Sequence, residues 1–372
     1  MWIDWLAQVA LTYQGYAALA FVVTVFATPL AAALARRIGV MDMPDTRLKP
    51  HARPIPYLGG AAICLGWAAA LLAALAAGKA SAALLTPILL GGLAMSTLGL
   101  IDDARHLSPR IRLLCGAVVI GLVLTLTGTG AKLVSSVTTT LGVPLPDALE
   151  TALSIAIGVV IVLGACNSTN LIDGLDGLCT GVTAIIALGF FLLAAHLASY
   201  RPQDPGHAIR LVMAVALFGA TLGFLPFNFN PARIFMGDAG SILLGYNCGV
   251  LILLFAEWNT LRWVFGALVV FALPVCDTLL AMLRRWRSGR SIFEGDRSHF
   301  YDQLVQRGFT VRQTVLISYA LSLLFAALGL VVLWMRTRYA LVVFISVFAC
   351  VAYTAWAIGL TNPDRREKPM QL

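Results

Sequence analysis

The sequence has little charge. Only 12% of its 372 residues are Asp, Glu, Lys or Arg, whereas soluble domains carry about 25%. Hydrophobic residues make up 59% of the chain, far more apolar surface than a soluble protein can bury. The composition therefore excludes a soluble globular protein and predicts that the chain lies in a lipid bilayer.

Other features are absent. The seven cysteines show no CxxC spacing, so we interpret them as small apolar residues rather than as zinc ligands or disulfides. The first apolar stretch lacks a basic segment and a small-residue cleavage site, so we expect it to be retained rather than removed as a signal peptide. With no soluble insertion and no internal repeat, we expect a single membrane-embedded domain, residues 1–372.

Apolar stretches long enough to span a bilayer, about 18–20 residues each, occur about 11 times. They predict an all-α, polytopic integral membrane bundle of about 11 transmembrane helices. The predicted spans are residues 14–35, 58–77, 83–101, 111–128, 152–168, 178–198, 208–226, 240–257, 261–281, 314–335 and 339–359.

The basic residues predict the orientation. Of the 26 Lys and Arg residues, 19 lie in one set of loops or in the C-terminal tail, and seven lie in the other set. Because cytoplasmic loops carry the excess of Lys and Arg, we expect the N-terminus outside and the C-terminus in the cytoplasm. The same bias accounts for the formal net charge of +8 without a nucleic acid as partner.

Acidic residues also gather in the predicted cytoplasmic loops, although Asp and Glu contribute little to topology. We predict that five of these loops form an active site: residues 36–57, 102–112, 166–177, 227–239 and 283–313. Mg²⁺ binds one or two carboxylates together with phosphate oxygens. Carboxylates at several span ends would therefore surround a metal ion and a phosphorylated substrate.

The loop "DDARHLSPRIR" carries two adjacent carboxylates, Asp102 and Asp103. Like charges at this spacing require a metal or a cationic partner. Arg105, Arg110 and Arg112 are the candidates for that partner. A helix cap would explain one of the aspartates but not both.

The loop "NSTNLIDGLDGL" repeats a polar residue every three positions, at Asn167, Asn170, Asp173 and Asp176. On a helical turn these side chains would share one face. A single capping residue would not need four polar groups, so the pattern favours a binding site.

Two further loops complete the predicted site. In "FNFNPARIFMGDAGS", Asp238 precedes a span, where a simple helix cap is the alternative, and Phe235 and Asn228 are suited to hold a nucleotide base. The first loop places Arg47 and His51 at the interface, where a positive-inside loop is the alternative reading. The last loop contains Arg297 and His299, a candidate clamp for a diphosphate.

Taken together, these motifs resemble the signatures of the polyprenyl-phosphate N-acetylhexosamine-1-phosphate transferases, glycosyltransferase family 4. The spans and the "PIPYLGG" segment resemble the undecaprenyl-phosphate GlcNAc-1-phosphate transferases most. The resemblance implies transfer of GlcNAc 1-phosphate, or of another N-acetylhexosamine 1-phosphate, from a UDP-sugar to undecaprenyl phosphate with release of UMP. Such a reaction starts a lipid-linked envelope glycan, as in lipopolysaccharide or teichoic acid synthesis.

The resemblance also implies a setting and a set of residue roles. It implies a multi-pass protein of the bacterial inner membrane, in contact with membrane lipid, with a cytoplasmic active site, and it leaves a homodimer open. Asp238 matches the Mg²⁺ ligand, with Mn²⁺ as an alternative ion, and Asp102 matches the acceptor of the lipid phosphate proton, with Asp103 beside it. The residues that match the nucleotide and metal site are Asn170, Asp173 and Asp176. Direct attack and a covalent phosphosugar intermediate on an aspartate both stay open.

This sequence departs from the family pattern at three places. Arg112 stands where the family has lysine, and one extra residue separates Arg47 from His51. The family's H-x-H-H reads "HFYD" here, residues 299–302, so only His299 remains. Because that loop contacts the sugar and the diphosphate in the family, the identity of the sugar is the least defined part of the prediction.

Two other classes of membrane protein fit less well. A secondary transporter would carry its ionisable groups near the bilayer midplane, whereas nearly all the acidic residues here lie at span ends. A CDP-alcohol phosphatidyltransferase also uses aspartates and Mg²⁺, but its longer aspartate motif is not completed after Asp173.

Overall fold

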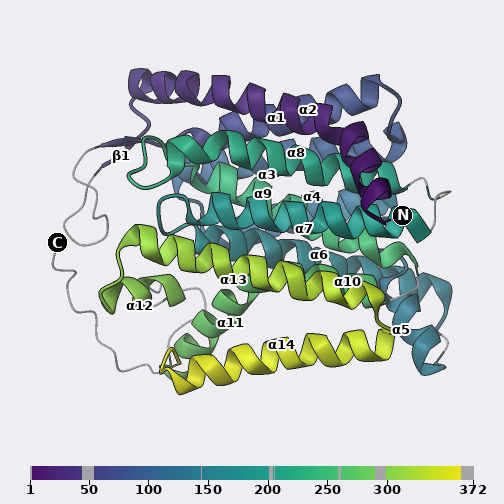
Figure 1. Ribbon diagram of the computed structural model, residues 1–372. Helices are drawn as coiled ribbons and strands as arrows, with labels where there is room; N and C mark the ends of the chain where they lie inside the picture. The colour runs from purple at the N-terminus through teal and green to yellow at the C-terminus, as the bar shows by residue number, and fades with distance from the viewer. Residues whose placement is uncertain are drawn as a thin grey trace.

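The computed structural model describes residues 2–43, 54–143, 145–200, 204, 206–258, 261–289 and 299–361. Long helices run side by side through the molecule (Figure 1). The described strands are β1 (Met41–Asp42) and β2 (Ile55–Pro56), which pair antiparallel with Met41 opposite Pro56 and Asp42 opposite Ile55. The prediction of an all-α bundle is confirmed.

The helices in chain order are α1 (Trp2–Ile38), α2 (Gly59–Ala76), α3 (Ala82–Arg105), α4 (Pro109–Thr127), α5 (Leu133–Leu141), α6 (Asp147–Ile172), α7 (Leu178–Tyr200), α8 (Gly206–Asn228), α9 (Gly237–Leu254), α10 (Leu261–Val270), α11 (Ala272–Arg287), α12 (Phe300–Gln306), α13 (Val311–Val331) and α14 (Thr337–Ala357). Two short 3₁₀ turns, η1 (Phe255–Trp258) and η2 (Val332–Trp334), follow α9 and α13.

The number of spans agrees with the prediction. Within the described ranges, ten helices are long and apolar enough to cross a membrane, and the pair α10 and α11 makes an eleventh, bent by 74°. The bend lies at Phe271, between Val270 and Ala272. Pro274 explains it, because a proline ring clashes with the carbonyl four residues earlier, which here belongs to Val270. The predicted ninth span is therefore a broken helix.

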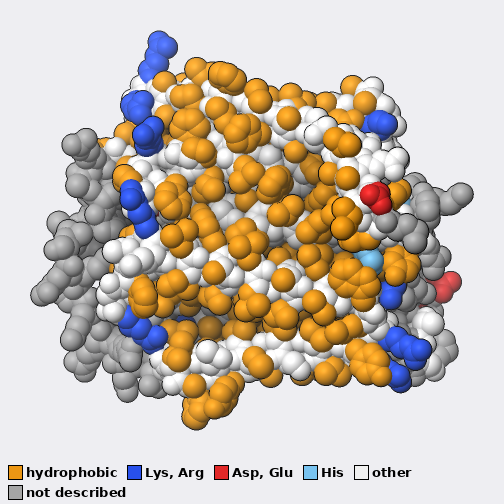
Figure 2. All heavy atoms as spheres, viewed as in Figure 1, with side chains coloured by type: hydrophobic (Ala, Val, Ile, Leu, Met, Phe, Trp, Pro, Cys, Tyr) orange, Lys and Arg blue, Asp and Glu red, His pale blue; other side chains and the backbone are white. Residues whose placement is uncertain are grey.

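Apolar side chains cover the middle of the visible face, and Lys and Arg side chains lie toward its two ends (Figure 2). Apolar side chains of α1, α4 and α6, such as Phe26, Leu114 and Val160, are also exposed. Helices α7, α8 and α9 are mostly buried and form the centre of the bundle. This arrangement is that of a multi-pass membrane protein, whose outer helices face lipid.

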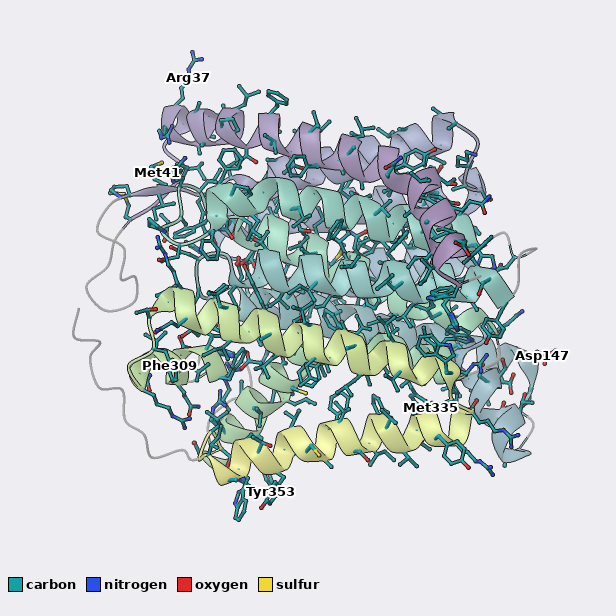
Figure 3. All side chains as sticks on the ribbon, viewed as in Figure 1. Arg37, Met41, Asp147, Phe309, Met335 and Tyr353 are labelled. Atoms are coloured by element: carbon teal, nitrogen blue, oxygen red, sulfur yellow. The ribbon has the colours of Figure 1, made fainter. Side chains whose placement is uncertain are left out.

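The predicted motifs meet at one end of the bundle, which we call the carboxylate end: the end where α3 and α6 stop and α9 begins, with Asp102, Asp173 and Asp238. It is the end at which β1 and α12 lie (Figure 1). Arg37, Met41 and Phe309 lie at this end in Figure 3, and Asp147 and Met335 lie at the opposite end.

Candidate active site

The close packing of α3 against α9 brings two of the motifs together. A methyl group added at Gly99 of α3 would lie 2.5 Å from the carbonyl oxygen of Asp238, so the two backbones touch, as small residues allow in membrane helices. Gly237 has a φ of +69°, a conformation that favours glycine, and a methyl group there would lie 2.6 Å from Asp103 Oδ2. The carboxylates at the end of α3 therefore lie beside the first turn of α9.

Asp238 lies at the centre of the polar contacts. Asn170 Nδ2 donates to its Oδ1 at 2.7 Å, and Arg112 Nη1 donates to its Oδ2 at 3.2 Å. Asn170 also donates to Ser241 Oγ at 3.1 Å. Residues from α4, α6 and α9 thus converge on one carboxylate, as the sequence motifs predict.

Asp102 and Asp103 face different partners although they are adjacent. Asp102 is buried, accepts from Leu107 N–H at 2.7 Å and from Arg112 Nη1 at 2.9 Å, and so shares this guanidinium with Asp238. Asp103 accepts from the backbone N–H groups of Asp238 and Ala239 at 2.9 and 3.2 Å. It therefore caps the N-terminus of α9, where a negative charge is stabilised. Of the three arginines proposed as partners, Arg112 makes the ion pairs.

Asp173 is the C-cap residue of α6. Burial and the charges of Asp238, Asp103 and Asp176 raise the pKa of its carboxyl group well above the usual range. Several carboxylates thus lie close together with few positively charged side chains near them. Such an environment favours a bound cation.

The expected shared face of the "NSTNLIDGLDGL" motif is wrong. Helix α6 stops at Ile172 and the chain turns through residues 173–177, so only Asn167 and Asn170 keep the helical spacing. Asp176 points to the α8–α9 loop instead, where its Oδ2 accepts from Asn230 Nδ2 at 3.0 Å and from Ala232 N–H at 2.9 Å. Asp176 therefore orders that loop.

Asn228, at the end of α8, is also engaged by the protein. Its Oδ1 accepts from Gly177 N–H at 3.2 Å and from Thr180 Oγ1 at 2.8 Å, and its Nδ2 donates to the carbonyl of Ile234 at 3.1 Å. These bonds join the start of α7 to the loop that carries Phe235. Contact of Asn228 with a base stays a prediction.

Phe235 and Tyr57 form an aromatic edge of the site. Phe235 N–H donates to the carbonyl of Pro56 at 2.9 Å, and its ring meets the Tyr57 ring edge-on at 6.4 Å between centroids. Burial, followed by the charges of Asp103, Asp238 and Asp173, raises the pKa of the Tyr57 hydroxyl. Tyr57 is thus a protonated donor among carboxylates. The motifs gave it no role, because a single tyrosine two residues before a pair of glycines has no distinctive pattern.

His299 lies at the start of α12 and pairs with a residue that no motif indicated. Its Nδ1 lies 2.7 Å from Asp277 Oδ2 of α11. Burial lowers the pKa of His299, but the hydrogen bond and charge of Asp277 outweigh it and raise that pKa above its ordinary value. Arg47, His51 and Arg297 lie outside the described residues.

An apolar recess adjoins the polar cluster. It is lined by Arg112, Asn167 and Asn170 at its polar edge. Its remaining lining residues are Met95, Leu98, Leu113, Leu163, Cys166 and Ile242. A charged group and an apolar chain could thus be held side by side.

Within the described ranges, no three His, Cys, Asp or Glu side chains are grouped as a metal-binding set. Mg²⁺ does not require such a set, because water and phosphate oxygens complete its octahedral shell. The hard oxygen atoms of Asp238 and Asp173, with their excess negative charge, fit this ion.

Comparison with known proteins agrees with the motifs. Residues 85–256 match the family model described as glycosyl transferase family 4. The chain is 31% identical over 344 residues to the probable undecaprenyl-phosphate N-acetylglucosaminyl 1-phosphate transferase of Bacillus subtilis, covering 90% of this chain and 89% of the relative. It is 34% identical over 323 residues to the decaprenyl-phosphate N-acetylglucosaminephosphotransferase of Mycobacterium tuberculosis, covering 81% and 77%.

A phospho-N-acetylmuramoyl-pentapeptide-transferase of Moorella thermoacetica is 34% identical over 173 residues, which is 46% of this chain and 50% of that protein. The matches to the two N-acetylglucosamine enzymes cover more of the chain than the match to this protein. The resemblance seen in the motifs is confirmed: the chain belongs to glycosyl transferase family 4, the family of the polyprenyl-phosphate N-acetylhexosamine-1-phosphate transferases.

Proposed function

We propose that the protein transfers N-acetylglucosamine 1-phosphate from UDP-N-acetylglucosamine to undecaprenyl phosphate and releases UMP. The main support for this proposal is the cluster in which Arg112 bridges Asp102 and Asp238 beside an apolar recess. A cationic side chain beside an apolar recess suits a phosphate on a lipid chain. The names of the relatives support N-acetylglucosamine and a polyprenyl phosphate.

The reaction joins two anions. An oxygen of the lipid phosphate forms a bond to the sugar-linked phosphorus of the UDP-sugar, and the bond from that phosphorus to the bridging oxygen breaks, so UMP leaves with the electron pair. Because both partners are negatively charged, catalysis depends on positioning and charge neutralisation. Arg112 would bind the lipid phosphate, and Asp102 would accept its proton.

Asp238, with Asp173 nearby, would hold Mg²⁺ or Mn²⁺. When bound, this ion supplies the positive charge that neutralises the diphosphate of the donor. Asn170 fixes the orientation of the Asp238 carboxylate, and Phe235 with Tyr57 offers an aromatic surface to the uracil. Asp103 and Asp176 keep α9 and the α8–α9 loop in place around the nucleotide.

The site would face the cytoplasm of a bacterial inner membrane. The excess of Lys and Arg in the loops that carry the active-site motifs supports that orientation. UDP-sugars are water-soluble, so a site at the cytoplasmic edge of the bilayer lets the nucleotide meet a lipid that stays in the membrane.

The test uses membranes that contain the protein, undecaprenyl phosphate, Mg²⁺ and UDP-N-acetylglucosamine. We expect UMP and a labelled lipid. Both should be lost in Asp238→Asn and on chelation of the metal, and both should be kept in Asp147→Asn, whose carboxylate lies exposed at the opposite end. UMP release only with another UDP-N-acetylhexosamine would change the sugar and keep the chemistry. Full activity of Asp238→Asn would refute the assigned site.

A further inference from the structure

Three side chains join α11 and α12 to the end of α6: Asp277, His299 and Tyr301, which we call the brace. Asp277 is buried, accepts from Phe300 N–H at 3.0 Å through Oδ1 and contacts His299 Nδ1 at 2.7 Å through Oδ2. His299 is only 4% exposed. A buried carboxylate and imidazole at this distance form a charge-assisted hydrogen bond that fixes the plane of the ring.

Tyr301 continues the brace toward the active site. Its ring stacks on the His299 imidazole, with centroids 5.3 Å apart and planes 4° from parallel. Its hydroxyl donates to the carbonyl of Leu171 at 2.8 Å, in the last turn of α6. Two of its ring carbons would lie 2.6 Å from a methyl group at position 174, so the tyrosine fits because residue 174 is glycine.

These contacts lie before and after Asp173 in the chain. Tyr301 hydrogen-bonds Leu171, two residues before Asp173, and packs against Gly174, the residue after it. Asp302 also fixes His299, because its carboxylate accepts from the His299 N–H group at 3.2 Å at the start of α12. The position of the Asp173 backbone is therefore fixed by side chains that the proposed reaction does not use.

We propose that Asp277 and Tyr301 are positioning residues that hold Asp173 near Asp238 in the active site, with Asp277 acting through His299. The inference rests on the proposed function. It also gives the "HFYD" segment a role, since each of its residues holds α12 or Asp173 in place. In this arrangement one face of the His299 ring packs against Tyr301, and its Nδ1 pairs with Asp277.

The test compares Asp277→Asn, Tyr301→Phe and the double variant. We expect each single variant to raise the KM for UDP-N-acetylglucosamine about 10-fold. This is the effect of removing a residue that orients a binding group without contacting the substrate itself. The KM for undecaprenyl phosphate should stay within about twofold, because that substrate lies toward Arg112. The double variant should be no worse than the poorer single variant, since both changes break the same linkage.

Asp147→Asn and Tyr353→Phe serve as matched controls, because both side chains are exposed and lie away from the brace. A purely structural role would reduce the amount of active protein and change neither KM. Should Asp277→Asn fail to fold, Tyr301→Phe carries the test, because it removes one hydroxyl and keeps the stacked ring.

Unchanged KM values in an active parent background, or effects that multiply in the double variant, would overturn the inference alone. A parent protein that releases no UMP would overturn the proposed function and this inference with it.

Discussion

Removing the Arg112 guanidinium should impair catalysis more than any other single change to a basic side chain among the described residues. One nitrogen, Nη1, reaches Asp102 at 2.9 Å and Asp238 at 3.2 Å. A charge-assisted hydrogen bond contributes about 1.5–3 kcal/mol. The side chains of Arg112 and Asp238 are 25% and 24% exposed, so water screens part of this, and we take about 2–3 kcal/mol for both bonds together.

If Arg112→Met loses that energy in the transition state, kcat/KM falls about 30- to 160-fold. Arg112→Lys should stay within about fivefold of the parent, because a single nitrogen makes both contacts and an ammonium group is a point charge. This would explain how arginine stands where the family has lysine. Arg110→Met, exposed in the first turn of the same helix, is the control.

The assay is the initial rate of UMP release by purified protein, with thermal unfolding in detergent measured alongside. If Arg112→Met is as active as Arg110→Met, the bridge has no part in the reaction. If Arg112→Lys is as impaired as Arg112→Met, the forked shape of the guanidinium matters and its charge alone is insufficient.

Three further predictions concern residues that support the site. Gly99→Ala should lower both the unfolding temperature and the activity, because the new methyl group meets the α9 backbone; Gly164→Ala, with nothing within 4 Å, should change neither. Asp176→Asn should cost about 1–2 kcal/mol of unfolding free energy through the weakened acceptor and raise the KM for the UDP-sugar, and a KM equal to that of the parent would contradict the role of Asp176 in ordering the α8–α9 loop. Finally, Asp277 raises the pKa of His299 above its ordinary value of 6.5 despite burial. The stabilisation by the charged pair should be complete below pH 6.5 and lost as pH rises through the raised pKa, and Asp277→Asn should remove this dependence of Tm on pH.

The spans could be predicted from the sequence because lipid imposes a minimum apolar length on each helix. The predicted fifth span, residues 152–168, is part of the 26-residue α6, whose ends are polar and extend beyond the apolar run. Two short helices, α5 and α12, were not predicted, since nine and seven residues give little periodic signal. The break at Phe271 depends on where a proline ring meets the preceding turn, and hydropathy does not report this.

The convergence of Asp102, Arg112, Asn170 and Asp238 was also predictable, because charged groups at span ends on one side of a membrane meet at one surface. The direction of Asp176 was not, since the three-residue spacing indicates a shared face only while the chain stays helical, and α6 ends at Ile172.

Asp277 was missed for a different reason. It lies in the apolar first part of α11, and its partner His299 is 22 residues away in the chain, so only the tertiary packing brings them together. Similarly, the tyrosine of "HFYD" reads as a lost family histidine, whereas in the structure it contacts Leu171, two residues before Asp173, and Gly174, directly after it.

In the proposed reaction the sugar moves together with its phosphate. The most direct measurement supplies the purified protein with UDP-N-acetylglucosamine labelled with ³H in the sugar and with ³²P at the sugar-linked phosphorus, together with undecaprenyl phosphate and Mg²⁺. Both isotopes should enter the lipid in equal amounts, and UMP should be released. Lipid that contains ³H without ³²P, with UDP as the other product, would show glycosyl transfer and refute the proposed function.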